Sequence, residues 1–111
     1  MKVAVSSTGK DLNSQVSDNF GRCPFFIMAK IENGEIKALE AMENLSQEQM
    51  GGAGISAARA VVEKGVGAVI VANIGPRALA VLSQFKVDVF KGRGSVRKSL
   101  QEFIQGKLEK L

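Results

Sequence analysis

The pattern of apolar and polar positions predicts β-strands in the first part of the chain. Lys2–Ser6 is a short predicted strand with an apolar centre, and a polar loop follows it. In Phe25–Ile31 the apolar residues recur with the period of two that places side chains on one face of a strand. Asn33-Gly34 is a strong hairpin signal, because both central residues of a type I′ turn need a positive φ. Glu35–Glu43 is rich in helix-favouring residues, but the turn before it favours a returning strand, and we interpret it as a strand.

The second half of the chain alternates between helix and strand patterns. A helix is predicted over about Ala53–Lys64, and the next helix begins at Pro76, where a missing N–H costs nothing. Ala68–Ala72 is apolar throughout, as expected of a strand buried on both faces, and Val87–Phe90 is another short strand. Ser95 can cap a last helix whose apolar residues form one stripe. Strands that alternate with helices imply parallel crossovers, so we expect a mixed sheet with helices on both faces.

The composition describes one globular domain spanning residues 1–111. Of these residues 45% are hydrophobic and 23% are charged, which is typical of a folded soluble protein. No apolar run approaches the ~20 residues of a membrane span, and the single cysteine excludes an intrachain disulfide, so we expect a cytoplasmic protein. The net charge is +4, and basic residues gather only toward the C-terminus, at Lys86, Lys91, Arg93, Arg97 and Lys98. We favour a solvated helix surface there over a polyanion-binding face, and we expect neither nucleic-acid nor membrane partners.

Two glycine-bearing turns each stand where a predicted helix begins. Met50–Ile55 runs directly into the first helix, and Asn73–Pro76 lies between a buried strand and the next helix. Glycine allows a positive φ and the close approach of a ligand, while a helix N-terminus offers unpaired N–H groups to an anion. If both turns lie on one edge of the sheet, with Ser6-Ser7 and Asn19–Cys23, they form a pocket built from backbone. The plainer interpretation is that both turns are only tight connections.

The absence of histidine removes most routes to catalysis. Without it the chain can form neither a Ser-His-Asp or Cys-His nucleophile system nor a histidine zinc site. Gly52-x-Gly54-x-x-Ala57 formally fits a dinucleotide-binding fingerprint, but a polar loop stands where that fingerprint needs a strand. A two-metal nuclease needs clustered carboxylates, and the predicted strands Lys2–Ser6 and Ala68–Ala72 carry none. We therefore predict no catalytic residues and no enzymatic activity.

Three blocks of the chain resemble the signatures of one known family. Asp18–Phe26, Gly51–Ile55 and Asn73–Pro76 are similar, in order and spacing, to motifs of the dinitrogenase iron–molybdenum cofactor biosynthesis family, which includes nitrogenase accessory proteins and small stand-alone members. The resemblance implies a three-layer α/β/α ribonuclease H-like fold with a five-stranded mixed sheet, in which Glu35–Glu43 is a strand. It also implies a non-enzymatic protein that holds an iron–sulfur or iron–molybdenum cluster or precursor, with cluster-assembly or acceptor proteins as partners.

The predicted cofactor-binding residues come from these blocks and the residue before the second: Asn19, Arg22, Cys23, Met50, Gly51, Gly52, Gly54, Asn73 and Gly75. Many family members carry histidine at the position of Asn19 and in the glycine loop, so Cys23 is the one good metal ligand left. Its neighbour Arg22 would favour the thiolate; we favour a structural role for Cys23 over a ligand role, with a redox role third. Arg22 either directs its guanidinium at an anion or pairs with a local acid. Asn73 is interpreted as a cap of its loop rather than as a ligand.

The predicted function is that of a carrier that holds a cluster weakly. Charge and backbone N–H groups would hold the cluster first and Cys23 second, so that replacing Cys23 removes only part of the binding. The alternative is a regulatory or protein-interaction module that has lost cluster binding and uses the pocket for another anion or a partner. The expected oligomeric state is a monomer or a weak homo-oligomer. Phe20, Phe25 and Phe26 are interpreted as core residues rather than as part of a cofactor site.

Overall fold

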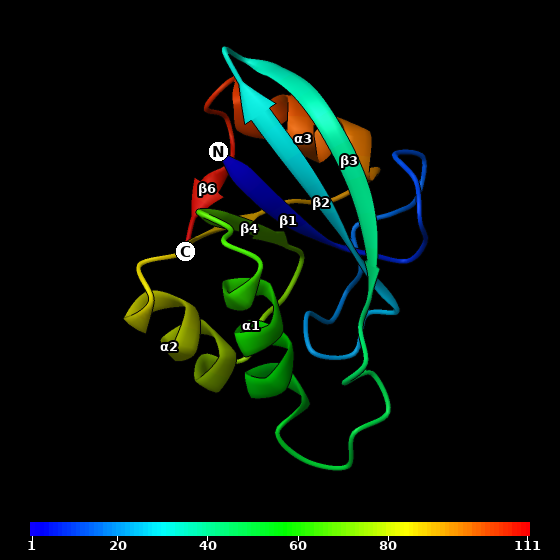
Figure 1. Ribbon diagram of the computed structural model, residues 1–111, viewed down its shortest axis with the longest axis vertical. Coiled ribbons are helices and arrows are strands. Elements are labelled where there is room, and N and C mark those ends of the chain that lie inside the picture. Colours follow the sequence, from blue (N-terminus) through cyan, green and yellow to red (C-terminus); the bar gives the residue numbers. More distant parts are fainter.

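The computed structural model describes residues 1–111 and contains one sheet of six strands with three helices (Figure 1). In chain order the elements are β1 (Lys2–Ser7), β2 (Phe25–Glu32), β3 (Glu35–Glu43), α1 (Ala53–Glu63), β4 (Ala68–Val71), α2 (Pro76–Gln84), β5 (Asp88–Lys91), α3 (Val96–Ile104) and β6 (Glu109–Lys110). The predicted order of strands and helices is confirmed up to α3. None of the three helices combines the length and the apolar character that a membrane crossing requires.

The sheet is mixed, as the sequence predicts. Its strand order is β3-β2-β1-β4-β5-β6, with parallel pairing of β1 with β4 and of β4 with β5, and antiparallel pairing elsewhere. The resemblance implies a five-stranded sheet, and this number is wrong because the sheet has six strands. The sixth strand, β6, pairs Glu109 with Lys91 and Lys110 with Phe90. Two exposed polar residues carry no strand pattern of their own, so only pairing with β5 makes them a strand.

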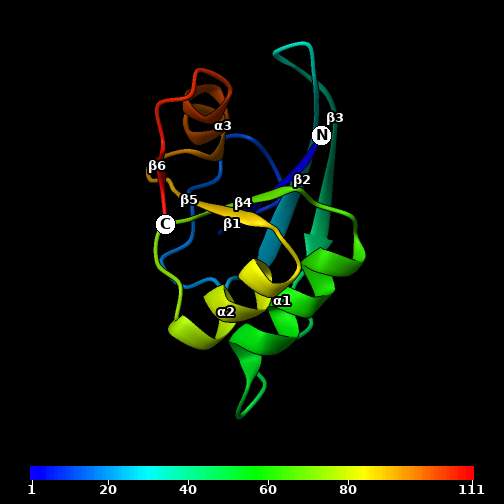
Figure 2. The same cartoon turned by 90° about the vertical axis from the view of Figure 1, so that its left-hand side faces the viewer.

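Helices cover both faces of the sheet (Figure 2). On one face α1 and α2 pack over a core that includes Ala4 of β1, Val69 and Leu82. On the other face α3 packs over a second core, to which β1 contributes Val3 and Val5. Strand β1 thus alternates between the two cores and is buried on both sides. The sheet is the middle layer, and its central strands are shielded from water.

The hairpin between β2 and β3 confirms the prediction made from its turn. Asn33 and Gly34 have φ values of 54° and 75°, as a turn with two positive φ angles requires. Strand β3 is mostly exposed and lies at the edge of the sheet, yet it pairs with β2 from Glu35 to Glu43, with one register shift opposite Lys30 and Ile31. Cross-strand pairing therefore overrides the helix-favouring composition of β3.

The three helices begin in two different ways. Ser95 caps α3, because its Oγ accepts a hydrogen bond from the backbone N–H of Lys98 at 3.1 Å, as predicted. Helices α1 and α2 are preceded by Gly52 and Gly75, which supply no side-chain cap, and neither helix has an acidic residue in its first turn. The positive ends of α1 and α2 are therefore uncompensated within the chain.

Candidate functional site

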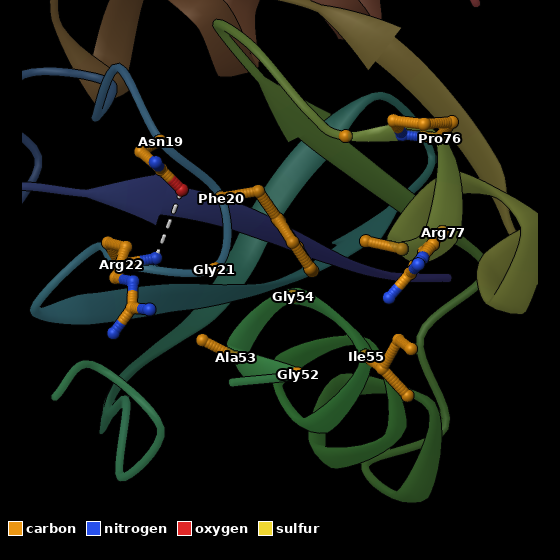
Figure 3. A pocket seen from close by; sticks show the side chains of 12 residues that line it. Asn19, Phe20, Gly21, Arg22, Gly52, Ala53, Gly54, Ile55, Pro76 and Arg77 are labelled. Carbon is orange, nitrogen blue, oxygen red and sulfur yellow. Dashed lines mark hydrogen bonds between the residues drawn. The ribbon is translucent and has the colours of Figure 1, made fainter. Parts of the chain in front are cut away.

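A pocket of about 380 Å³ opens where three segments meet (Figure 3). It is lined by the turn Asn19–Arg22, the start of α1 at Gly52–Ile55 and the start of α2 at Gly75–Ala78. The prediction that both glycine-bearing turns and the Asn19–Cys23 turn meet at one site is confirmed for these residues. Ser6 and Ser7, which were expected at the same edge, are fully buried and do not line the pocket.

The chemistry of the pocket is set by backbone N–H groups. Gly52 takes a left-handed conformation with φ of 69°, which turns the chain into α1. The first N–H groups of α1 have no acceptor within their own helix, and the same is true of α2 after Pro76. Because both helix starts line one cavity without an acid or a capping side chain, the pocket favours an anion.

Close packing of small residues brings the three segments together. A Cβ atom placed on Gly21 would lie 2.8 Å from both the N and the Cα of Gly54. A Cβ atom on Gly54 would lie 3.2 Å from the Cβ of Ala78. The backbone N–H of Phe20 also donates to the carbonyl of Asn73 at 3.2 Å. The turn, α1 and α2 therefore form one compact unit, in which Gly21 has a packing role that the sequence analysis did not recognise.

Arg22 does not pair with a local acid, which was one of the two roles predicted for it. Its Nη1 donates hydrogen bonds to the backbone carbonyls of Gln47 and Gln49, and not to an acidic side chain. The guanidinium thus attaches the loop that precedes α1 to the Asn19–Arg22 turn. Arg22 still lines the pocket (Figure 3), and its Nε and Nη2 donors make no hydrogen bond within the chain. A ligand could use that free edge while the loop stays attached.

Arg77 is the second cation of the pocket, and the sequence analysis missed it. It is the second residue of α2, it is exposed, and it lines the wall opposite Arg22 (Figure 3). None of the three salt bridges of the protein involves Arg22 or Arg77. Its position directly after the Gly75-Pro76 helix start was the available signal, because a cation there adds to the positive end of the helix.

Asn44 was also not predicted, and it stabilises the turn that lines the pocket. It is buried at the end of β3, and its Nδ2 donates to the carbonyls of Gly21 at 3.1 Å and Cys23 at 2.8 Å. Its Oδ1 accepts from the N–H of Ser46 at 3.0 Å. A single buried side-chain amide thus connects the Asn19–Arg22 turn to the loop that follows β3. An asparagine after a strand is common in turns, so the sequence carried no distinct signal for this role.

Cys23 lies in the core beneath the turn and does not line the pocket. Its thiol donates to the carbonyl of Phe20 at 3.3 Å, and desolvation by burial raises the pKa of the thiol to about 12. The expectation that Arg22 favours the thiolate is therefore wrong, because the guanidinium is directed to the loop carbonyls and burial dominates. Nor does any group of three or more His, Cys, Asp or Glu side chains lie close enough to hold a metal ion.

The raised pKa of Cys23 predicts a specific loss of stability at high pH. The unfolded thiol ionises near its ordinary pKa of 9.0, whereas the folded thiol stays protonated up to about pH 12. The stabilisation is therefore complete below pH 9 and is lost as the pH rises toward 12. Urea unfolding across this range should show a loss on the order of 4 kcal/mol that the Cys23→Ser variant lacks. Equal pH slopes for the two proteins would contradict the burial of the thiol.

The remaining predicted residues lie at the rim or outside the lining. Met50 and Gly51 are exposed in the loop, with Met50 fully so, and Asn73 is exposed as well. The side chain of Asn73 makes no hydrogen bond, so its predicted capping role is wrong; only its carbonyl is used, by Phe20. Asn19 does line the pocket, and its Oδ1 accepts from the N–H of Arg22 at 3.2 Å (Figure 3).

The three phenylalanines of the first block separate into two groups. Phe20 and Phe26 are buried with ring centroids 5.2 Å apart, which confirms them as core residues. Phe20 is also part of the pocket wall. Phe25 is half-buried, and the ammonium group of Lys10 lies 5.3 Å from its ring centroid. Its predicted core position therefore holds only in part.

Fold and site together define a small α/β protein with a backbone-lined pocket at two helix starts, and comparison with known proteins gives its family. Residues 1–106 match the family model described as dinitrogenase iron–molybdenum cofactor. An uncharacterised protein of Methanocaldococcus jannaschii is 43% identical over 99 residues, which cover 88% of this chain and 84% of the relative. The chain belongs to the dinitrogenase iron–molybdenum cofactor family.

Solved structures of similar proteins have the same fold. The apo form of the orange protein from Desulfovibrio gigas superimposes with a TM-score of 0.92 at 28% identity, covering 99% of this chain and 92% of that one. A Thermotoga protein described as a candidate NifB protein gives a TM-score of 0.82 at 36% identity, again covering 99% and 92% of the two chains. A candidate dinitrogenase from Methanocaldococcus jannaschii gives 0.78 at 27% identity, with coverage of 100% and 94%.

Proposed function

We propose that this protein is a non-enzymatic carrier that holds an anionic iron–sulfur or iron–molybdenum cluster, or a precursor of one, in the pocket between α1 and α2. The observation that carries the proposal is the convergence on one cavity of two uncapped helix starts and two arginines that form no salt bridge. Such a site offers N–H donors and positive charge at fixed positions. The family name points to the same class of cargo, and the relative from Desulfovibrio gigas was solved as an apo form, which implies a loaded form.

The hydrogen-bond donors of the pocket fit a cluster whose metals are already coordinated by non-protein ligands. The pocket wall contains no cysteine, histidine or carboxylate that could bond directly to iron or molybdenum. Metal sites that depend on protein thiolates or imidazoles are therefore a poor match. A cluster whose metals are already coordinated by sulfide presents an anionic surface, which backbone N–H groups and guanidinium groups can bind. Binding of this kind is reversible, as a carrier that delivers its cargo requires.

A second candidate is a regulatory or protein-interaction module that binds a different anion in the same pocket. The burial of Cys23 favours it, because the one thiol of the chain is withdrawn from the cavity. Phosphate and carboxylate groups match the same donors as a sulfide cluster does. The two candidates predict different occupants of the same pocket, so one binding experiment can separate them.

The other parts of the proposal concern the setting in which the carrier acts. Cluster-assembly or acceptor proteins would be its partners, and the cytoplasm its location. The ribonuclease H-like classification of the layered fold stays a prediction, and it implies no catalysis by itself. A metal-dependent nuclease activity that disappears on replacing one named Asp or Glu would contradict the non-enzymatic proposal.

The proposal is tested by reconstitution under anaerobic conditions. The protein is incubated with ferrous iron, sulfide and molybdate, desalted, and analysed for iron and molybdenum. We expect the metals to be retained, and the Cys23→Ser variant to retain as much as the unchanged protein, because the thiol lies outside the pocket. Loss of retention in Cys23→Ser, with its fold intact, would make the thiol a ligand after all. No retention, with phosphate or sulfate bound instead, would favour the second candidate.

A further inference from the structure

A second, more apolar cavity lies on the outer side of the paired helices α1 and α2, away from the anion pocket. Its volume is about 420 Å³, and it is lined by Arg59, Val62 and Glu63 of α1 and by Val81, Gln84 and Phe85 at the end of α2. Phe85 is 54% exposed, which is unusual for a large aromatic side chain. The two helices lie side by side on the surface (Figure 2). This face is therefore open, and nothing within the chain covers it.

The two charged side chains on this face form no salt bridge within the chain. Arg59 and Glu63 are both exposed and lie four positions apart on α1, yet they form none of the three salt bridges of the protein. An arginine that precedes a glutamate by four residues is the less favourable order for pairing within a helix. The face thus carries one unpaired charge of each sign beside an apolar groove, and its net charge is zero.

We propose that this face, defined by Arg59, Val62, Glu63, Val81, Gln84 and Phe85, binds the same face of a second copy of this chain about a two-fold axis. A two-fold contact requires a surface that complements itself. With α1 running antiparallel to its counterpart and the axis near residue 61, Arg59 faces Glu63 of the partner subunit. The same ion pair then forms twice, once on each side of the axis.

The apolar residues of α2 repeat this arrangement. Val81 and Phe85 are also four positions apart, so an antiparallel contact places Phe85 against Val81 of the partner subunit. The half-exposed ring of Phe85 is then removed from water in both subunits, which gives the contact its hydrophobic driving force. Gln84 lies between these two positions and supplies a polar side chain near the axis.

The charges on this face also favour a second copy of the chain over other binding partners. A partner with a single sign of charge would satisfy either Arg59 or Glu63 and be repelled by the other, whereas an identical face satisfies both.

The pairing leaves the anion pockets accessible, because they lie at the N-terminal ends of α1 and α2 and the groove lies at the C-terminal ends. The groove is small beside the interfaces of stable dimers, so we expect weak self-association that high salt weakens further. This inference does not depend on what the pocket binds.

Charge reversal provides the test, with sedimentation analysis over a range of concentrations as the measurement. The unchanged protein should dimerise in a concentration-dependent way, and Phe85→Ala should weaken the dimer about tenfold or more. Arg59→Glu alone and Glu63→Arg alone should each stay monomeric, since like charges then face each other twice. Mixing the two variants should restore association, because every Glu again faces an Arg.

The matched control is Lys98→Glu on α3, which lies on the opposite face of the sheet and should leave the dimer unchanged. Circular dichroism verifies that each variant is folded. A monomer at every concentration would overturn the proposal and leave the groove to a different protein. Dimerisation that neither single reversal affects, or that the mixture does not restore, would overturn it as well and place the contact on another surface.

Discussion

Replacing Gly21 with valine is expected to lower the free energy of unfolding by about 3 kcal/mol and to open the anion pocket. A Cβ atom at this position would lie 2.8 Å from the backbone N and Cα of Gly54, at the start of α1. Backbone atoms of a helix cannot move aside as a flexible side chain can, so the turn and α1 must separate. Urea unfolding measures the loss of stability, and anaerobic reconstitution measures the accompanying loss of iron and molybdenum retention.

The control for Gly21→Val is Gly75→Ala in the same pocket. Gly75 has a φ of −75°, and no atom lies within 4 Å of a Cβ placed on it. Alanine there should change the free energy of unfolding by less than about 1 kcal/mol, because the restriction of the unfolded chain and the lower preference for alanine than for glycine at a helix N-cap oppose each other. If Gly21→Val were as stable as Gly75→Ala, the close packing of the three segments would not be what forms the pocket.

Replacing Arg77 with glutamate is expected to reduce cluster retention by about tenfold or more, since it removes a charge-assisted donor and places a negative charge in the pocket wall. The fold should be preserved, because an acidic residue in the first turn of α2 interacts favourably with the helix dipole. Retention is measured as iron and molybdenum bound per protein after anaerobic reconstitution. Stability is measured in parallel by urea unfolding.

Arg97→Glu is the matched control for Arg77→Glu. Arg97 is also the second residue of its helix and is exposed, but α3 lies on the other face of the sheet. The two variants change the net charge of the protein equally, so overall electrostatics is the same. Equal losses of retention in both would mean that the cluster responds to the charge of the whole protein and not to the pocket.

The fold was largely predictable because its core strands and helices carry strong local patterns. Ala68–Val71 is apolar throughout, and Ser95 caps α3 as its position indicated. The two elements that local pattern did not determine are the strands at the sheet edges. Strand β3 has a helix-favouring composition and needed the family resemblance to support its turn signal, and β6 has no pattern at all. Edge strands depend on a neighbour in space, which periodicity does not describe.

The parts of the candidate site that depend on glycine turns could be predicted from the sequence. The parts that depend on contacts between distant residues could not. The starts of α1 and α2 were recognised because Gly52 and Gly75 stand directly before helices. The pKa of Cys23 was predicted in the wrong direction, since its neighbour in sequence, Arg22, turns away to the loop carbonyls while the thiol is buried. The role of Asn44 rests on contacts with residues more than twenty positions away, which no local pattern indicates.

The central claim is that an anionic metal–sulfur cluster binds at the starts of α1 and α2. Amide NMR spectra recorded during anaerobic reconstitution with ferrous iron, sulfide and molybdate test it most directly. The account predicts that signals shift or broaden first for Asn19–Arg22, Gly52–Ile55 and Gly75–Ala78, in step with metal uptake. Metal uptake with the changes centred elsewhere, for example on the basic residues around Lys91 and Arg93, or no uptake at all, would contradict it.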